Sequence, residues 1–260
     1  RHAYGDVYKN RCYDGYGKAD NSVELRFGPN ITDWPSMSAL TDNVLLKVVS
    51  FITDPVTTTD ELIPSGETSS YRSNPLKLAE FALSRKDPAY VGRAKEVQKA
   101  EKARLSGCNP VDVLGELKDI SDTIKSEFNE FDFENTGIGS TIYAVKPGDG
   151  SAREQAASCQ KVLGGWANIA SEYATKRYRS NLINWGMIPF ILDGTPSFEN
   201  GDYIYVPEIK KAIENKKKEI PSYIIKKGKV IPFMLKMGDI TDDEKKIILD
   251  GCLINFYSEK

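Results

Sequence analysis

Short apolar runs rich in β-branched residues alternate along this chain with longer stretches of helical periodicity. The first clear strand is expected at residues 44–52, an apolar run that ends before Pro and turn-forming hydroxyl residues. Further strands are expected at residues 141–145, 166–170, 187–192 and 202–206, with a hairpin at 223–227 and 229–236. Alternation of strands with helices predicts the α/β class.

The longest helical region is expected between Asn74 and residue 131. Asn74 followed by Pro75 suits an N-cap and a first helical position. Apolar side chains then recur every three or four residues and predict one buried face: Leu114, Leu117, Ile120, Ile124, Phe128 and Phe131. The polar stretch 85–104 is expected to be a solvated helix face, and residues 135–139 break the pattern.

Later helices are expected at residues 156–163, 172–185 and 207–219. The last helix has a capping box at Thr241 and Glu244 and is expected to end at Gly251.

The pattern divides the chain into two parts. Residues 1–40 have little periodicity and are expected to be an irregular lead-in. Residues 41–260 form the expected domain, with a helical insertion at about 74–135.

Composition narrows the classes of partner. The net charge of −2 gives no basic footprint for nucleic acid or an anionic membrane, and no apolar run reaches the length of a membrane span. We therefore expect neither partner. The four cysteines contain no C-x-x-C pair, which argues against a disulfide framework and a zinc site. They are expected to be small buried side chains in a reducing cytoplasm: Cys12, Cys108, Cys159 and Cys252.

The chain has one histidine, His2. Acid–base chemistry would therefore fall to Ser, Tyr, Lys or carboxylates, or to residues on another chain.

The turn at residues 148–154 combines several features that suit an anion-binding site. Gly148 and Gly150 allow a tight turn between a strand and a helix. Ser151 and Arg153 then place a hydroxyl and a guanidinium at the positive end of that helix. Ser151 and Glu154 also have the spacing of a capping box, and the turn read alone favours a capped helix start.

Three further segments give this turn a context. Residues 148–154 resemble a Gly-acidic-Gly-Ser-Ser-Arg-Glu signature, with Gly164 and Gly165 following at the matching distance. Residues 181–189 resemble an Asn-Leu…Gly-Leu-Leu-Pro segment, and residues 57–66 a Thr-Thr-Asp segment. Together, in this order, they resemble the aconitase-type iron–sulfur hydro-lyases, and specifically their C-terminal swivel domain.

The resemblance implies a swivelling β/β/α domain and a set of active-site residues. Ser151 matches the serine that, as an alkoxide, removes a proton from the carbon next to a substrate carboxylate. Asp60 matches the active-site aspartate of the Thr-Thr-Asp turn. Arg153 and Arg72 match two arginines that bind the substrate, a small hydroxy polycarboxylate that undergoes reversible dehydration. Such a serine needs a helix N-terminus and a nearby guanidinium, because it is a very poor base at neutral pH.

The sequence departs from the family at several positions. Ala152 replaces a second serine, while Glu61 and Gln155 stand where many members have histidine. The cysteine ligands of the [4Fe–4S] cluster are absent, so the resemblance implies that the cluster sits on cluster-bearing aconitase domains, in the same polypeptide or in a separate subunit. No metal is expected on this chain, which is expected to be inactive alone.

Two alternatives stay open. The chain could be an RNA-binding, regulatory or non-catalytic interaction module of the same fold, or a scaffold whose motifs only cap helices. A second resemblance, to the substrate-binding stretch of NADP-dependent isocitrate dehydrogenases, covers only residues 1–10.

Overall fold

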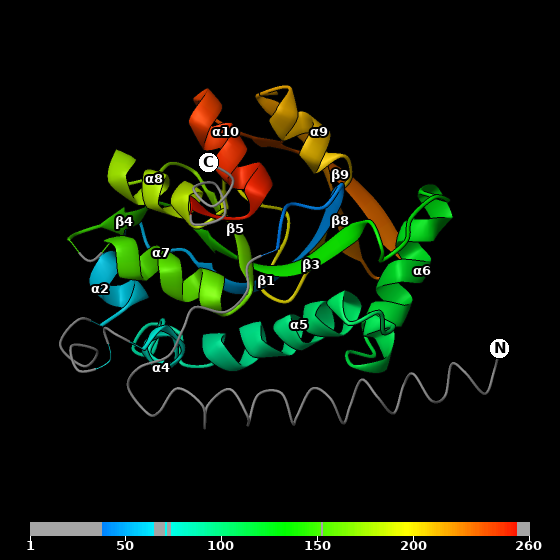
Figure 1. Ribbon diagram of the computed structural model, residues 1–260, viewed down its shortest axis with the longest axis horizontal. Coiled ribbons are helices and arrows are strands. Elements are labelled where there is room, and N and C mark those ends of the chain that lie inside the picture. Colours follow the sequence, from blue (N-terminus) through cyan, green and yellow to red (C-terminus); the bar gives the residue numbers. More distant parts are fainter. Residues whose placement is uncertain (1–37, 65–70, 72–73, 152, 254–260) are drawn as a thin grey trace.

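A closed barrel organises the computed structural model, which describes residues 38–64, 71, 74–151 and 153–253 (Figure 1). Around the barrel the strands are β1 (Asn43–Ile52), β3 (Thr136–Ala144), β5 (Gly165–Ala170), β6 (Ile188–Ile191), β9 (Lys229–Lys236), β8 (Glu219–Lys226) and β7 (Tyr203–Val206). The first four run parallel, and the other neighbours pair antiparallel. The predicted α/β class, strands and hairpin are confirmed. The predicted lead-in and residues 1–10 lie outside the described residues, except for the last positions before residue 41.

Helices cover the barrel on two sides (Figure 1). One side carries α4 (Pro75–Ala79), α5 (Tyr90–Leu105) and α7 (Arg153–Val162), with α6 (Leu117–Glu127) near the hairpin of β8 and β9. The other carries α8 (Lys176–Asn184), α9 (Ile209–Glu214) and α10 (Asp242–Asp250). Two short elements complete the set: the four-residue helix α2 (Thr59–Leu62) and the 3-10 turn η2 (Pro110–Asp112).

The barrel wall is buried on both faces. In β1, Leu45 and Val49 join the core beneath α4, α5 and α7, while Val44, Leu46 and Val48 join the core that includes α9 and α10. All nine residues of β3 are buried. The predicted apolar face of residues 114–131 also packs on the first core. The helices of the expected insertion therefore share a core with the barrel.

Helix ends follow the local sequence as predicted. Asn74 accepts the Lys77 backbone N–H at 3.2 Å, with Pro75 in the first turn. Thr241 and Glu244 form the reciprocal capping box, and Gly251 ends α10 in the left-handed conformation at φ 98°. These predictions are confirmed.

The helical pattern breaks at residues 135–139 as expected, and the strand that follows, β3, already begins at Thr136. Its glycines make room for an aromatic ring. A Cβ on Gly137 would lie 1.9 Å from Cη2 of Trp166, and one on Gly139 would lie 2.8 Å from its Cγ. The two glycines in this break are therefore strand residues against which a tryptophan packs.

Two predicted helices are too long. The helix expected at residues 207–219 ends at Glu214, because Glu219 already belongs to β8. The helix expected at residues 172–185 begins at Lys176, where the side chain of Thr175 accepts the Tyr178 N–H.

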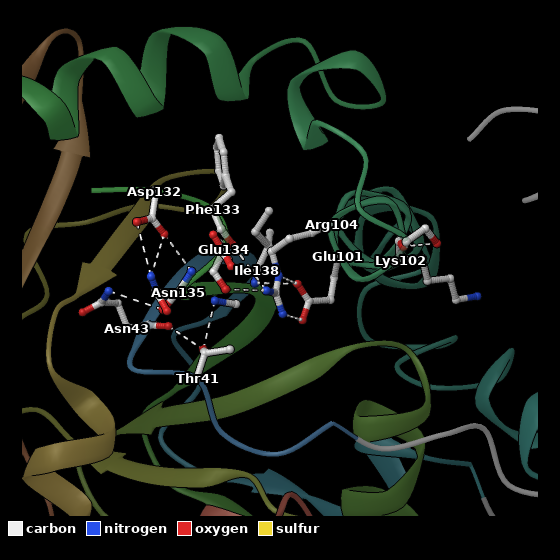
Figure 2. Close-up of polar contacts among 12 residues, drawn as sticks. Thr41, Asn43, Glu101, Lys102, Arg104, Asp132, Phe133, Glu134, Asn135 and Ile138 are labelled. Atoms are coloured by element: carbon white, nitrogen blue, oxygen red, sulfur yellow. Dashed lines mark hydrogen bonds and ion pairs between the residues drawn. The ribbon is translucent and has the colours of Figure 1, made fainter. Parts of the chain in front are cut away.

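The expectation of a solvated face at residues 85–104 is wrong for its last turn (Figure 2). Glu101 is 8% exposed and accepts the backbone N–H of Ile138 at 3.0 Å. It also accepts from Arg104 Nε at 2.5 Å, and Arg104 donates to the carbonyls of Phe133 and Glu134. This largely buried charge pair fastens α5 to the start of β3, because Glu101 also accepts from the Ile138 backbone and Arg104 also donates to the two carbonyls.

The cysteines behave in two ways. Cys159 and Cys252 are free and buried, as predicted. Cys108 is only half-buried and is disulfide-bonded, so the expectation of a free buried thiol is wrong there. Cys12 lies outside the described residues. In the described part of the chain, no helix combines the length and hydrophobicity needed to cross a membrane.

Lys161 yields a prediction about stability against pH. It is 7% exposed, its Nζ lies 5.8 Å from the centre of the Trp166 ring, and burial lowers its pKa from 10.5 to about 8. A folded-state pKa below the unfolded value means that the charged form destabilises the fold at pH values below about 8. The penalty fades as the pH rises from there toward 10.5.

We expect Lys161→Met to raise the free energy of unfolding at neutral pH by up to roughly 3 kcal/mol. Its gain over the wild type should shrink toward pH 10.5, as measured by urea unfolding across this range. Lys211→Met, at an exposed position of α9, is the control and should keep the wild-type pH dependence. An identical pH dependence in Lys161→Met and the wild type would contradict the assignment.

Candidate active site

A short pair of strands at one end of the barrel brings two distant segments together. β2 (Thr57–Thr58) pairs in parallel with β4 (Pro147–Asp149), in a register that places Thr57 by Pro147 and Thr58 by Asp149. The backbone N–H of Thr57 donates to the carbonyl of Lys146 at 2.9 Å. Because β2 leads into Asp60 and β4 leads into Ser151, the structure brings these two predicted residues to the same edge.

The Asp60 segment is shaped by a capping box. Thr58 Oγ1 accepts the Glu61 N–H at 3.1 Å, and Glu61 Oε1 accepts the Thr58 N–H at 3.1 Å. Glu61, which departs from the family pattern, therefore closes the first turn of α2. The T-x-x-E spacing is visible in the sequence and is the signal that would have found this cap.

The two glycines of the second segment are required by close contacts. Gly150 has φ +127°, and a Cβ there would lie 2.4 Å from Oγ1 of Thr59. Gly148 has φ +102°, and a Cβ there would lie 2.3 Å from the Tyr178 ring. The turn therefore rests on α2 on one side and on α8 on the other, as only glycine allows.

A buried polar network supports the turn from below. The Tyr178 hydroxyl donates to Asn168 Oδ1 at 2.6 Å and accepts from Gln160 Nε2 at 2.9 Å. Asn168 in turn donates to Gln160 Oε1 at 2.6 Å, and Thr175 Oγ1 donates to the Gly148 carbonyl at 3.2 Å. Burial raises the pKa of Tyr178 above its ordinary value, so its hydroxyl stays neutral. The network links β5, α7 and α8 to the turn.

The predicted catalytic residues are both at the surface. Ser151 is exposed and lies two positions before Arg153, the first residue of α7. Asp60 is exposed in the first turn of α2, a favourable place for a carboxylate.

The predicted substrate-binding residues are two arginines. Arg153 begins α7 directly after the turn, and Arg72 lies outside the described residues.

Cations from the segment between α4 and α5 line the same edge. Arg85 Nη1 lies 3.5 Å from Asp60 Oδ2. Lys86 forms ion pairs with Asp54 and with Glu61, the latter at 3.4 Å. The hydrogen bond that Lys86 donates to Asp54 raises the pKa of Lys86 and lowers the pKa of Asp54. Sequence reasoning missed Arg85, since nothing local links it to a residue 25 positions earlier.

The described residues do not fit an iron–sulfur cluster. Within them, no group of three or more His, Cys, Asp or Glu side chains is arranged to hold a metal ion. Burial raises the pKa of the Cys159 thiol to about 12, which keeps it protonated and makes it a poor ligand.

Comparison with known proteins finds a related family. Residues 116–194 match the model of the aconitase C-terminal domain family. This part of the chain is similar to the aconitase C-terminal domain. The matched segment runs from the start of α6 to just beyond β6, so it includes β4, the turn and α7. The expected family and fold are confirmed.

Two individual proteins extend the comparison. The chain is 25% identical to aconitate hydratase A of Rickettsia bellii, over 94% of this chain and 29% of that protein. It therefore spans less than a third of the curated relative that it matches. The solved 3-isopropylmalate dehydratase of Methanocaldococcus jannaschii is 20% identical, with 84% of this chain and 94% of that chain covered and a TM-score of 0.49. At that score the likeness carries no argument about function.

Two glycine substitutions separate the effect on stability of the close contact at Gly148 from that of its left-handed backbone conformation. We expect Gly148→Ala to destabilise the protein by roughly 2 kcal/mol more than Gly201→Ala does. Both glycines have positive φ, +102° and +92°, but a Cβ at Gly201 meets nothing within 4 Å, whereas one at Gly148 meets the Tyr178 ring. Urea unfolding of the two variants measures the difference, and equal losses would show that Tyr178 does not support the turn.

Proposed function

We propose that this chain is the substrate-binding and base-bearing swivel domain of an aconitase-type hydro-lyase. It acts on a hydroxy polycarboxylate, which is reversibly dehydrated and rehydrated. The observation that carries the proposal is the pairing of β2 with β4, which puts Asp60 and Ser151 at one edge of a domain of this family.

Ser151 is the base in this proposal. As an alkoxide it removes the proton from the carbon next to a substrate carboxylate. Its exposure leaves the hydroxyl accessible, and the start of α7 stabilises negative charge through backbone N–H groups and the helix dipole. The contacts of Gly148 and Gly150 fix the backbone on which the hydroxyl is carried. A fixed base loses little orientational freedom when the substrate arrives.

The other assigned residues handle the charges of the substrate. Arg153 and Arg72 bind its carboxylates, for which a planar guanidinium offers two parallel hydrogen bonds. Asp60 is the second catalytic residue, at the turn beside Ser151. The name of the curated relative suggests aconitate as the first compound to try.

The rest of the enzyme lies elsewhere in this proposal. Because the described residues offer no cluster ligands, the [4Fe–4S] cluster belongs to another domain or subunit, against which this domain closes. The 260-residue chain alone is then inactive. We also propose a cytoplasmic location. We further propose no partnership with nucleic acid or membrane, because the net charge of −2 offers no basic footprint for either.

In the complete, cluster-loaded enzyme, Ser151→Ala is expected to lower kcat by about 10²–10⁴-fold, because it removes the base. Hydration of aconitate is the assay. Ser126→Ala, at an exposed position of α6, is the matched control and should leave kcat unchanged. Full turnover by Ser151→Ala on the compound that the wild type converts would refute the assignment of the base.

A further inference from the structure

We propose that Arg85, on the turn between α4 and α5, is a further substrate-binding residue that contacts a carboxylate of the hydroxy acid. The inference rests on the proposed function and adds to it a cation that neither the family signature nor the sequence pattern identifies. Four sets of contacts carry it.

The first contact is a backbone bond that docks this turn on α2. The N–H of Leu83 donates to the carbonyl of Leu62, the last residue of α2, at 2.9 Å. Leu83 is 1% exposed and has φ +56°, a left-handed conformation that a bulky residue rarely adopts. Two gains offset this unfavourable backbone conformation: a hydrogen bond to the last carbonyl of α2 and the burial of the Leu83 side chain. The turn thus has a defined position relative to Asp60.

Lys86 and Asp87, the two residues after Arg85, anchor the turn on its other side. Lys86 pairs with Asp54 and with Glu61 of α2. Asp87 accepts from Ser50 Oγ at 2.7 Å and pairs with Arg93 of α5. Arg85 therefore lies between two fixed points, and its backbone cannot move away from α2 without breaking these pairs.

The side chain of Arg85 is directed to the site edge. Its Nη1 lies 3.5 Å from Asp60 Oδ2, and the two side chains are 54% and 58% exposed. An ion pair this exposed adds little to the stability of the fold. The docking of the turn is therefore not explained by the stability of this pair, and the exposed guanidinium remains accessible to a ligand.

The pair also lies next to the turn that carries Ser151. Thr59, the residue before Asp60, is the one that Gly150 approaches so closely that no Cβ fits. A polycarboxylate bound at this turn meets the negative charge of Asp60. Arg85 offsets that charge and offers the two-point grip that a carboxylate favours. It thereby favours substrates with a carboxylate on the α2 side of the site.

Calorimetric titration of the 260-residue chain with citrate tests the proposal directly. We expect Arg85→Gln to weaken citrate binding by about 10- to 100-fold, the range for losing a charge-assisted hydrogen-bond pair. Arg85→Lys keeps the charge without the planar grip and should give an intermediate affinity. Lys95→Gln is the matched control. Lys95 pairs with Glu80 at 43% and 49% exposure, in the same helical region, and the variant should bind citrate as the wild type does.

Equal citrate affinity in Arg85→Gln and the wild type would overturn the proposal, and so would an equal loss in Lys95→Gln. Unfolding midpoints of the variants confirm that the fold is intact. In the complete enzyme, Arg85→Gln should raise KM with little change in kcat, a split that a merely structural role would not produce.

The two experiments distinguish a failure of the proposed function from a failure of the Arg85 assignment. If Ser151→Ala keeps its turnover while Arg85→Gln loses affinity, the base assignment fails and Arg85 stands. If Ser151→Ala loses turnover and Arg85→Gln binds normally, Arg85 alone is rejected.

Discussion

The candidate site depends on the parallel pairing of β2 with β4. Each strand is only two or three residues long, yet the pair joins segments about ninety positions apart in the sequence. So short a pairing needs further support, and the close contacts of Gly148 and Gly150 supply it. β2 and β4 follow the carboxyl ends of the parallel strands β1 and β3, the edge at which α/β proteins commonly place their ligands.

Beneath this edge lie buried polar side chains. Burying them without hydrogen-bond partners would destabilise the fold, and they form hydrogen bonds with one another. Tyr178, Asn168 and Gln160 form a closed set of hydrogen bonds that ties α7 and α8 to β5. The Glu101–Arg104 pair does the same for α5 and β3 at a distance from the site. The barrel thus presents the turn at residues 148–151 on a stiff base, while the exposed groups stay accessible to solvent and substrate.

Local chemistry made part of this structure predictable. The caps at Asn74 and Thr241 and the buried runs of the barrel follow from residue type and spacing, and the neighbourhood of Asp60 and Ser151 follows from the family resemblance. Features that depend on distant partners were not predictable. The place of Gly137 and Gly139 in a strand depends on Trp166, which is absent from their local sequence, and the ion pair of Arg85 appears only when its turn docks on α2. Arg72 stays a prediction.

In the proposed function, the segments ending at Asp60 and Ser151 form one anion site. Backbone amide shifts recorded by NMR while the chain is titrated with citrate test this claim most directly. We predict that the amides of Thr59, Asp60, Gly150 and Ser151 shift together and give a single dissociation constant. Shifts confined to one segment, or two segments that titrate with different constants, would contradict a shared site.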